Sequence, residues 1–192
     1  MRNLLKLILS LFFLIGLITI CFYLPQLTAQ TPVKEALFYQ KLENKVVQCQ
    51  LCPRRCVISC GQRGFCGTRE NRDGTLYTLV YAKLVAIHID PIEKKPLFHF
   101  LPSTTAFSIA TAGCNLKCKF CQNWEISQAR PEEVEYTYIE PKELVEKAKA
   151  QGAPTIAYTY TEPTIFYEYM LETAKLAHKE GIKYNAFQWI YK

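Results

Sequence analysis

The stretch that decides the fold is Ala112-Gly-Cys-Asn-Leu-Lys-Cys-Lys-Phe-Cys-Gln-Asn-Trp124, a loop that follows a predicted strand at Ala106–Thr111. Its three cysteines have C-x3-C-x2-C spacing, and three such thiolates can hold three corners of a cubane iron–sulfur cluster. No cysteine follows Cys121, so the last iron would keep an open position for a small molecule. On spacing alone, a zinc site completed by Cys56 or His99 and a disulfide stay open as alternatives.

The sequence around this loop alternates between predicted strands and helices. A helix is expected at Pro141–Gln151, where proline begins it, and a strand at Thr155–Tyr160. Thr161 can cap a second helix that runs to Glu180 and stops at Gly181. A third strand is expected at Lys183–Ile190. This alternation predicts the α/β class, with a parallel sheet or barrel.

The motif Cys114-Asn-Leu-Lys-Cys118-Lys-Phe120-Cys121 resembles that of the radical S-adenosylmethionine (SAM) superfamily. Within it, the chain looks most like the branch of the pyruvate formate-lyase activating enzymes, and in that branch like the radical SAM member of the AmmeMemoRadiSam group. The resemblance covers about residues 35–183. Supporting segments, in order, are Cys49-Gln-Leu-Cys52-Pro-Arg-Arg-Cys56, Gly61-Gln-Arg-Gly-Phe-Cys66-Gly, Asp90-Pro-Ile-Glu-Lys-Lys-Pro-Leu-Phe-His-Phe-Leu-Pro102 and Tyr158-Thr-Tyr-Thr-Glu162-Pro-Thr.

This resemblance implies that Cys114, Cys118 and Cys121 ligate a [4Fe-4S] cluster whose open iron is chelated by the amine and carboxylate of SAM. It places Phe120 near the adenine and Glu162 where its carboxylate receives the SAM ammonium group. The expected fold is the N-terminal part of a radical SAM partial (βα) barrel.

The implied reaction is reductive cleavage of SAM to a 5′-deoxyadenosyl radical that abstracts hydrogen from a substrate. A low-potential electron donor is an expected partner. Activation of a glycyl radical in a partner protein is one form that the reaction can take.

A second cysteine group, with Cys49, Cys52, Cys56 and Cys66, has C-x2-C-x3-C-x9-C spacing. Four thiolates suit a closed site for structural zinc or for another iron–sulfur cluster, and the resemblance does not identify the metal. Cys60 is interpreted as a bystander, with the alternative that it takes the place of Cys66 as a ligand. The disulfide alternative stays open here too.

The surroundings of this second group combine one predicted helix with two predicted strands. Residues 31–48 are interpreted as a short amphipathic helix. The β-branched and aromatic runs Thr75–Val80 and Leu84–Ile89 predict strands. The expected domains are therefore a cysteine-rich metal-binding module with a β-rich linker at 31–103 and an incomplete barrel at 104–192.

The first thirty residues predict a transmembrane anchor or a signal segment. Arg2 and Lys6 precede the uncharged run Leu7–Leu24, which is 18 residues long and just sufficient to cross a bilayer. These basic residues favour export of the remainder, whereas SAM and reduced clusters favour the cytoplasmic face. Membrane association is expected, and its sidedness stays open.

Length and charge limit the remaining possibilities. The chain has 192 residues and a formal charge of +6, too mild over a mixed surface to indicate a nucleic-acid partner. Only two strand–helix units and the start of a third follow Thr104, so a truncated product with poor stability and no activity is expected. The alternative function is therefore a catalytically inactive iron–sulfur or zinc-binding protein.

Overall fold

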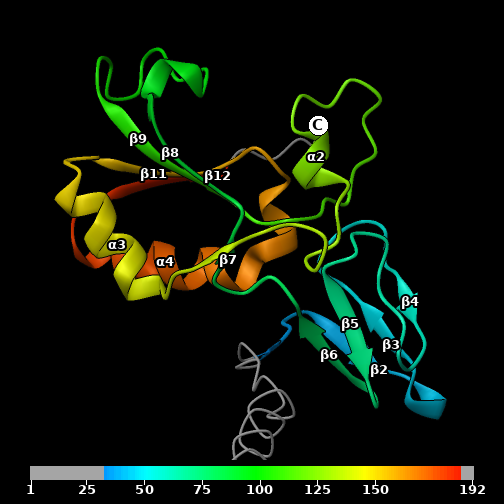
Figure 1. Cartoon of the computed structure of the whole chain (residues 1–192). Coiled ribbons are helices and arrows are strands. Elements are labelled where there is room, and N and C mark those ends of the chain that lie inside the picture. The colour runs from blue at the N-terminus through cyan, green and yellow to red at the C-terminus, as the bar shows by residue number, and fades with distance from the viewer. Residues whose placement is uncertain (1–32, 187–192) are drawn as a thin grey trace, which may run out of the picture. The chain divides into compact units, whose positions relative to one another are not determined.

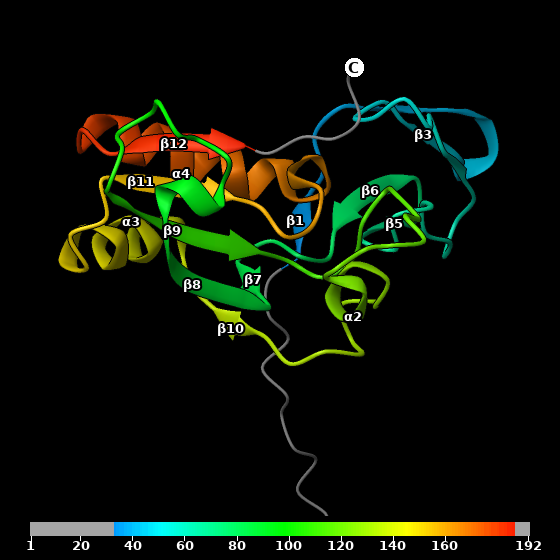
Figure 2. The same ribbon diagram turned by 90° about the horizontal axis from the view of Figure 1, so that it is seen from above.

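A four-stranded sheet forms the centre of this computed structural model, which describes residues 33–186. The strand order is β12 (Lys183–Ala186), β11 (Thr155–Tyr158), β9 (Thr105–Ala110) and β8 (Ala86–Pro91). The first three are mutually parallel and β8 is antiparallel to β9, as Figure 2 shows from above. The strands predicted after Thr104 are confirmed; residues 187–190, the end of the third, lie outside the described part.

Two helices cover one face of the sheet, α3 (Pro141–Ala150) and α4 (Tyr167–Lys179) (Figure 1). Successive strand residues point to opposite faces. Phe107 and Ile109 therefore join the core under the helices, whereas Ala106 packs on the other face beneath residues 91–104.

The second predicted helix begins later than expected. A 3₁₀ turn, η3 (Pro163–Phe166), precedes α4, and Thr161 does not cap either element. Its hydroxyl instead donates to the carbonyl of Thr111 at 3.1 Å, which ties the end of β11 to the end of β9. The expected stop at Gly181 is confirmed, since α4 ends at Lys179.

The cysteine-rich segment is built from short antiparallel strands. One sheet has the order β1-β6-β5 and another β2-β3-β4, while β10 pairs with β7. Their bounds are β1 Lys34–Glu35, β2 Tyr39–Lys41, β3 Val47–Cys49, β4 Val57–Ile58, β5 Arg69–Arg72, β6 Thr75–Thr78, β7 Lys83–Leu84 and β10 Thr137–Tyr138. The predicted strand at Thr75–Val80 is confirmed as β6, and the one at Leu84–Ile89 is divided between β7 and β8. The remaining short elements are η1 (Glu43–Lys45), η2 (Ile92–Lys94) and α2 (Trp124–Ser127).

The predicted helix at 31–48 is wrong. Leu37 and Leu42, expected on its apolar face, are 42% and 40% exposed, so no such face is buried. Phe38 adopts a φ of 56°, which breaks a helix, and β2 pairs with β3 instead. Burial of Val47 beneath its cross-strand neighbours outweighed the helical spacing.

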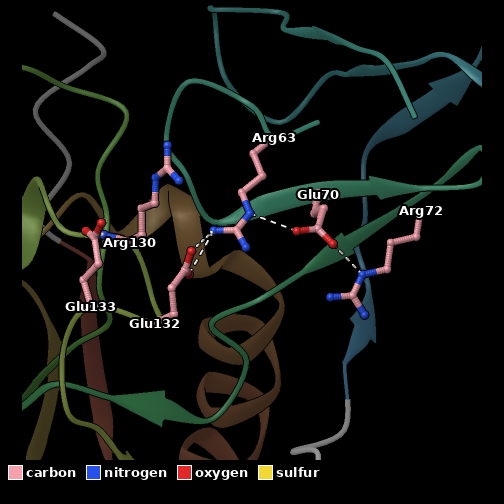
Figure 3. Close-up of polar contacts among 6 residues, drawn as sticks. All are labelled: Arg63, Glu70, Arg72, Arg130, Glu132 and Glu133. Carbon is pink, nitrogen blue, oxygen red and sulfur yellow. Dashed lines mark hydrogen bonds and ion pairs between the residues drawn. The ribbon is translucent and has the colours of Figure 1, made fainter. Parts of the chain in front are cut away.

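Buried and exposed ion pairs connect the cysteine-rich segment to the elements of the central sheet. Arg69 on β5 donates from Nη2 to both carboxylate oxygens of Glu168 on α4 at 2.7 Å, and each side chain is 2% exposed. Closer to the surface, Arg63 bridges Glu70 and Glu132, as Figure 3 shows. The two parts therefore share one polar interface.

The expected membrane segment at residues 1–30 lies outside the described residues. Between residues 33 and 186, no helix is both long and apolar enough to cross a membrane. The anchor and its sidedness stay predictions.

Candidate active site

The three-cysteine loop and the turn after β11 meet at one end of the sheet. Because β9 and β11 are parallel neighbours, their carboxyl ends lie together, which is the edge where α/β proteins place ligands. The amide of Thr159 donates to the carbonyl of Ile109 at 3.0 Å and continues the pairing to this edge. Residues 112–123 and 159–162 therefore form the candidate site.

Cys114 is the buried member of the loop. The Leu116 amide donates to its sulfur at 3.4 Å, and the backbone amide of Glu162 also favours its thiolate. Burial outweighs these donors and raises the pKa of the Cys114 thiol, with the Glu162 carboxylate and Cys121 adding to the effect. The structure thus brings Cys114, Cys121 and Glu162 close together.

The rest of the loop is more open. Cys118 is exposed and Cys121 is partly buried, with its sulfur 3.3 Å from the Ser127 hydroxyl. Phe120 is 91% exposed, so its ring faces solvent in the described structure. An aromatic ring left this open is free to pack on a ligand, but its expected contact with adenine stays a prediction.

Glu162 is a buried carboxylate at the end of β11. It is 1% exposed, and its Oε1 accepts a hydrogen bond of 2.7 Å from the Thr164 hydroxyl. A buried carboxylate beside the cysteine loop can attract an ammonium group.

Gly113 determines how closely the loop approaches the cysteine-rich segment. Its φ is +85°, and a Cβ there would lie 2.4 Å from Thr68 Cγ2 and 2.7 Å from the Cys66 carbonyl oxygen. Its amide donates to the Ile126 carbonyl at 2.9 Å. Only glycine fits this backbone without displacing its neighbours.

Comparison with known proteins finds a family model that matches this part of the chain. Residues 108–190 match the model of the Radical SAM superfamily. The chain carries a radical SAM superfamily domain. The match begins within β9 and includes the cysteine loop, β11 and the turn after β11, which build the candidate site.

Two relatives, both uncharacterized proteins of Methanocaldococcus jannaschii, extend the comparison. MJ0808 is 51% identical over 150 residues, which is 78% of this chain and 45% of the relative. MJ0674 is 36% identical over 100 residues, which is 50% of this chain and 25% of the relative. The chain thus spans less than half the length of these curated relatives. No solved structure matches.

The radical SAM domain implies an enzyme with a [4Fe-4S] cluster and SAM, and the residues present suit that group chemically. Three thiols on one loop are the ligands that such clusters take, and amide donors already face one sulfur. Both polar atoms of the buried Asn115 amide lack a partner, at the residue next to Cys114. Within residues 33–186 no three Cys, His, Asp or Glu side chains converge as metal ligands, so the three thiols have to move closer together to bind.

A polar cleft that the sequence analysis did not identify adjoins the loop. It measures about 630 Å³ and includes Asn123, two residues after Cys121. On its wall Asp90 accepts hydrogen bonds from Lys94 at 2.8 Å, from the buried Lys95 at 2.6 Å and from the Tyr160 hydroxyl. Burial alone raises the pKa of Asp90, but these donors outweigh it and hold that pKa well below its usual range. The sequence feature that could have indicated this cleft is the segment Asp90-Pro-Ile-Glu-Lys-Lys, which mixes acidic and basic residues next to a strand.

The second cysteine group surrounds a cavity of its own. Cys49, Cys52, Cys56 and Cys66 all line it. The eight cysteines within residues 33–186 are free thiols, so the structure does not pair any of them as a disulfide. Cys60 is exposed and outside this lining, as its interpretation as a bystander requires.

Proposed function

We propose that this chain is a radical SAM oxidoreductase in which Cys114, Cys118 and Cys121 hold the [4Fe-4S] cluster. The observation that carries the proposal is the meeting of the cysteine loop with Glu162 at the carboxyl end of β11, inside the segment matched by the family. When bound, the reduced cluster supplies the electron that cleaves SAM into methionine and a 5′-deoxyadenosyl radical, which abstracts a hydrogen atom from the substrate.

The protein residues bind and orient SAM. Glu162 accepts the ammonium group in a buried position, where a charge-assisted hydrogen bond is stronger than in water. Phe120, exposed on the loop, covers the adenine.

The substrate enters the cleft lined by Asp90, Lys95 and Tyr160. Its volume, about 630 Å³, lies in the range of ligand-binding clefts, and it adjoins Cys121 through Gln122 and Asn123. A peptide segment of a partner protein is the substrate that we propose, in an activase-like reaction. A low-potential one-electron donor is the second partner.

The test is SAM cleavage by the full chain, reconstituted with iron and sulfide under anaerobic conditions and reduced with dithionite. We expect release of 5′-deoxyadenosine and methionine in equal amounts, a result that would overturn the sequence-based expectation of an inactive truncated product. Cys118→Ser is expected to abolish it, whereas Cys60→Ser, which alters an exposed cysteine outside both groups, keeps it. A chain that binds iron but releases no 5′-deoxyadenosine would support the inactive metalloprotein alternative, and equal cleavage by both variants would refute the ligand assignment.

A further inference from the structure

The four cysteines of the second group reach one small cavity from two chain segments. Cys49 ends β3, Cys52 and Cys56 follow in the next turn, and Cys66 lies in the turn before β5. Gly64 brings the second turn close to the first, because a Cβ at this glycine would lie 3.3 Å from Ile58 Cδ1, tighter than usual contact. Residues up to 17 positions apart in the sequence therefore share one lining.

Hydrogen-bond donors already face two of these sulfur atoms. The Phe65 amide donates to Cys56 Sγ at 3.5 Å, and the Thr68 hydroxyl donates to Cys66 Sγ at 3.2 Å. Donors to sulfur stabilise a thiolate and orient it, as second-shell groups do around a metal. Such contacts suit thiolates that bind a metal.

The surrounding charge also suits thiolates. Four deprotonated cysteines around a divalent ion carry a net charge of −2, which needs compensation when buried. Arg54 and Arg69 both line the cavity, and because the charge of Arg69 is already paired with Glu168, Arg54 supplies the compensating charge. Arg69 is in turn fixed by Glu168, so its position does not depend on the metal.

The small cavity favours a single ion over a cluster. Its volume is about 20 Å³, little more than the ~10–15 Å³ that one water-sized sphere requires, whereas a cubane cluster has eight inorganic atoms. We propose that Cys49, Cys52, Cys56 and Cys66 bind one zinc ion in a closed tetrahedral site. Since no three metal-ligating side chains of residues 33–186 yet converge, the thiols close around the ion as it binds, as in other folding-coupled zinc sites.

This zinc site supports the radical SAM loop mechanically. Asn115, the residue after Cys114, lines the same cavity, and Arg54 Nε donates to its carbonyl oxygen at 2.6 Å. Fixing the turn that holds Arg54 therefore fixes the backbone beside the first cluster ligand. The four zinc ligands act in positioning and do not touch SAM.

The test is the metal content and zinc X-ray absorption spectrum of the full chain, purified anaerobically without added iron. We expect about one zinc per chain with four sulfur scatterers at about 2.3 Å. Cobalt substitution of the wild-type chain is a second measurement, which needs no variant to fold, and we expect the visible spectrum of a tetrahedral cobalt thiolate.

Three variants locate the zinc. Cys52→Ser is expected to lose at least nine-tenths of it, whereas Cys60→Ser and Cys118→Ser keep it. Zinc that persists in Cys52→Ser, a wild-type chain without zinc, or iron bound by the second group in its place would each overturn the proposal. Zinc retention is read without SAM or reductant, so failure here is distinguishable from failure of the proposed radical SAM function.

Discussion

Replacing Glu168 by glutamine breaks the buried contact between β5 and α4. The change keeps the size of the side chain but sets an amide N–H₂ against the guanidinium of Arg69, where both carboxylate oxygens now accept bonds at 2.7 Å. The Leu37 amide also loses an acceptor, or keeps a weaker one, in place of its 2.7 Å bond to Oε1. Arg69 is 2% exposed, so its charge is left buried and uncompensated.

The expected loss follows from this burial. Removing one partner of a buried ion pair costs about 3–5 kcal/mol, whereas an exposed pair is worth about 0–1 kcal/mol. Glu172→Gln is the matched control, one turn further along α4, where the pair with Lys34 is 37% and 42% exposed. We therefore expect Tm to fall by roughly 6–20 °C for Glu168→Gln and by less than about 4 °C for Glu172→Gln.

The assay is urea and thermal unfolding of the reduced, anaerobically purified chain, followed by circular dichroism. A double variant, Arg69→Met with Glu168→Leu, removes both charges and is expected to recover most of the loss, because apolar replacements of buried pairs are close to neutral. Equal losses for Glu168→Gln and Glu172→Gln would refute the reasoning, since burial would then make no difference.

Three further substitutions probe the candidate site. Gly113→Ala is expected to lower the free energy of unfolding by about 2–5 kcal/mol, because the backbone is strained and the new Cβ overlaps its neighbours. Gly152→Ala also has a positive φ but open space around it, so it is expected to cost only about 1–2 kcal/mol. Urea unfolding measures both. Asp90→Asn is expected to cost about 3 kcal/mol at pH 7, because Lys95 stays buried without its anion. Glu162→Gln is expected to weaken SAM binding roughly 10–100-fold, measured anaerobically by calorimetry.

The Asp90 carboxylate is also expected to make the stability of the protein depend on pH. The folded-state pKa of Asp90 lies below its unfolded value of about 3.9, so its stabilisation is complete above that value and is lost as pH falls through the folded pKa. Wild type should therefore lose part of its free energy of unfolding below about pH 4. Asp90→Asn should not show this part of the loss. Parallel acid-unfolding curves for the two proteins would contradict this role. Equal losses of stability for Gly113→Ala and Gly152→Ala would contradict the role given to Gly113. Unchanged SAM affinity of Glu162→Gln would contradict the role given to Glu162.

Local patterns predicted the elements that carry the site. Helix α3 was readable because proline begins it and Gly152 follows it, and strand β9 because apolar and small residues precede the cysteine loop. The spacing of Cys114, Cys118 and Cys121 indicated cluster chemistry before any fold was known. Each of these signals involves residues that are close together in the sequence, so it can be recognised without knowledge of the fold.

Contacts between residues that are far apart in the sequence could not be predicted from local patterns. The Arg69–Glu168 pair joins residues 99 positions apart, and the Asp90–Tyr160 contact joins residues 70 apart. The error at 31–48 has the same origin, because pairing of β1 with β6 and of β2 with β3 overrode a helix-like spacing of apolar residues. The shared cavity of the four cysteines likewise joins two chain segments that are separate in the sequence.

The most direct test of the radical SAM assignment is electron paramagnetic resonance of the reduced, reconstituted chain with and without SAM. The account predicts the spectrum of a reduced [4Fe-4S] cluster that changes when SAM is added, is lost in Cys118→Ser, and is retained in Cys60→Ser and in Cys52→Ser variants that stay folded. A spectrum that SAM leaves unchanged, or one that disappears with Cys52 and persists without Cys118, would contradict it.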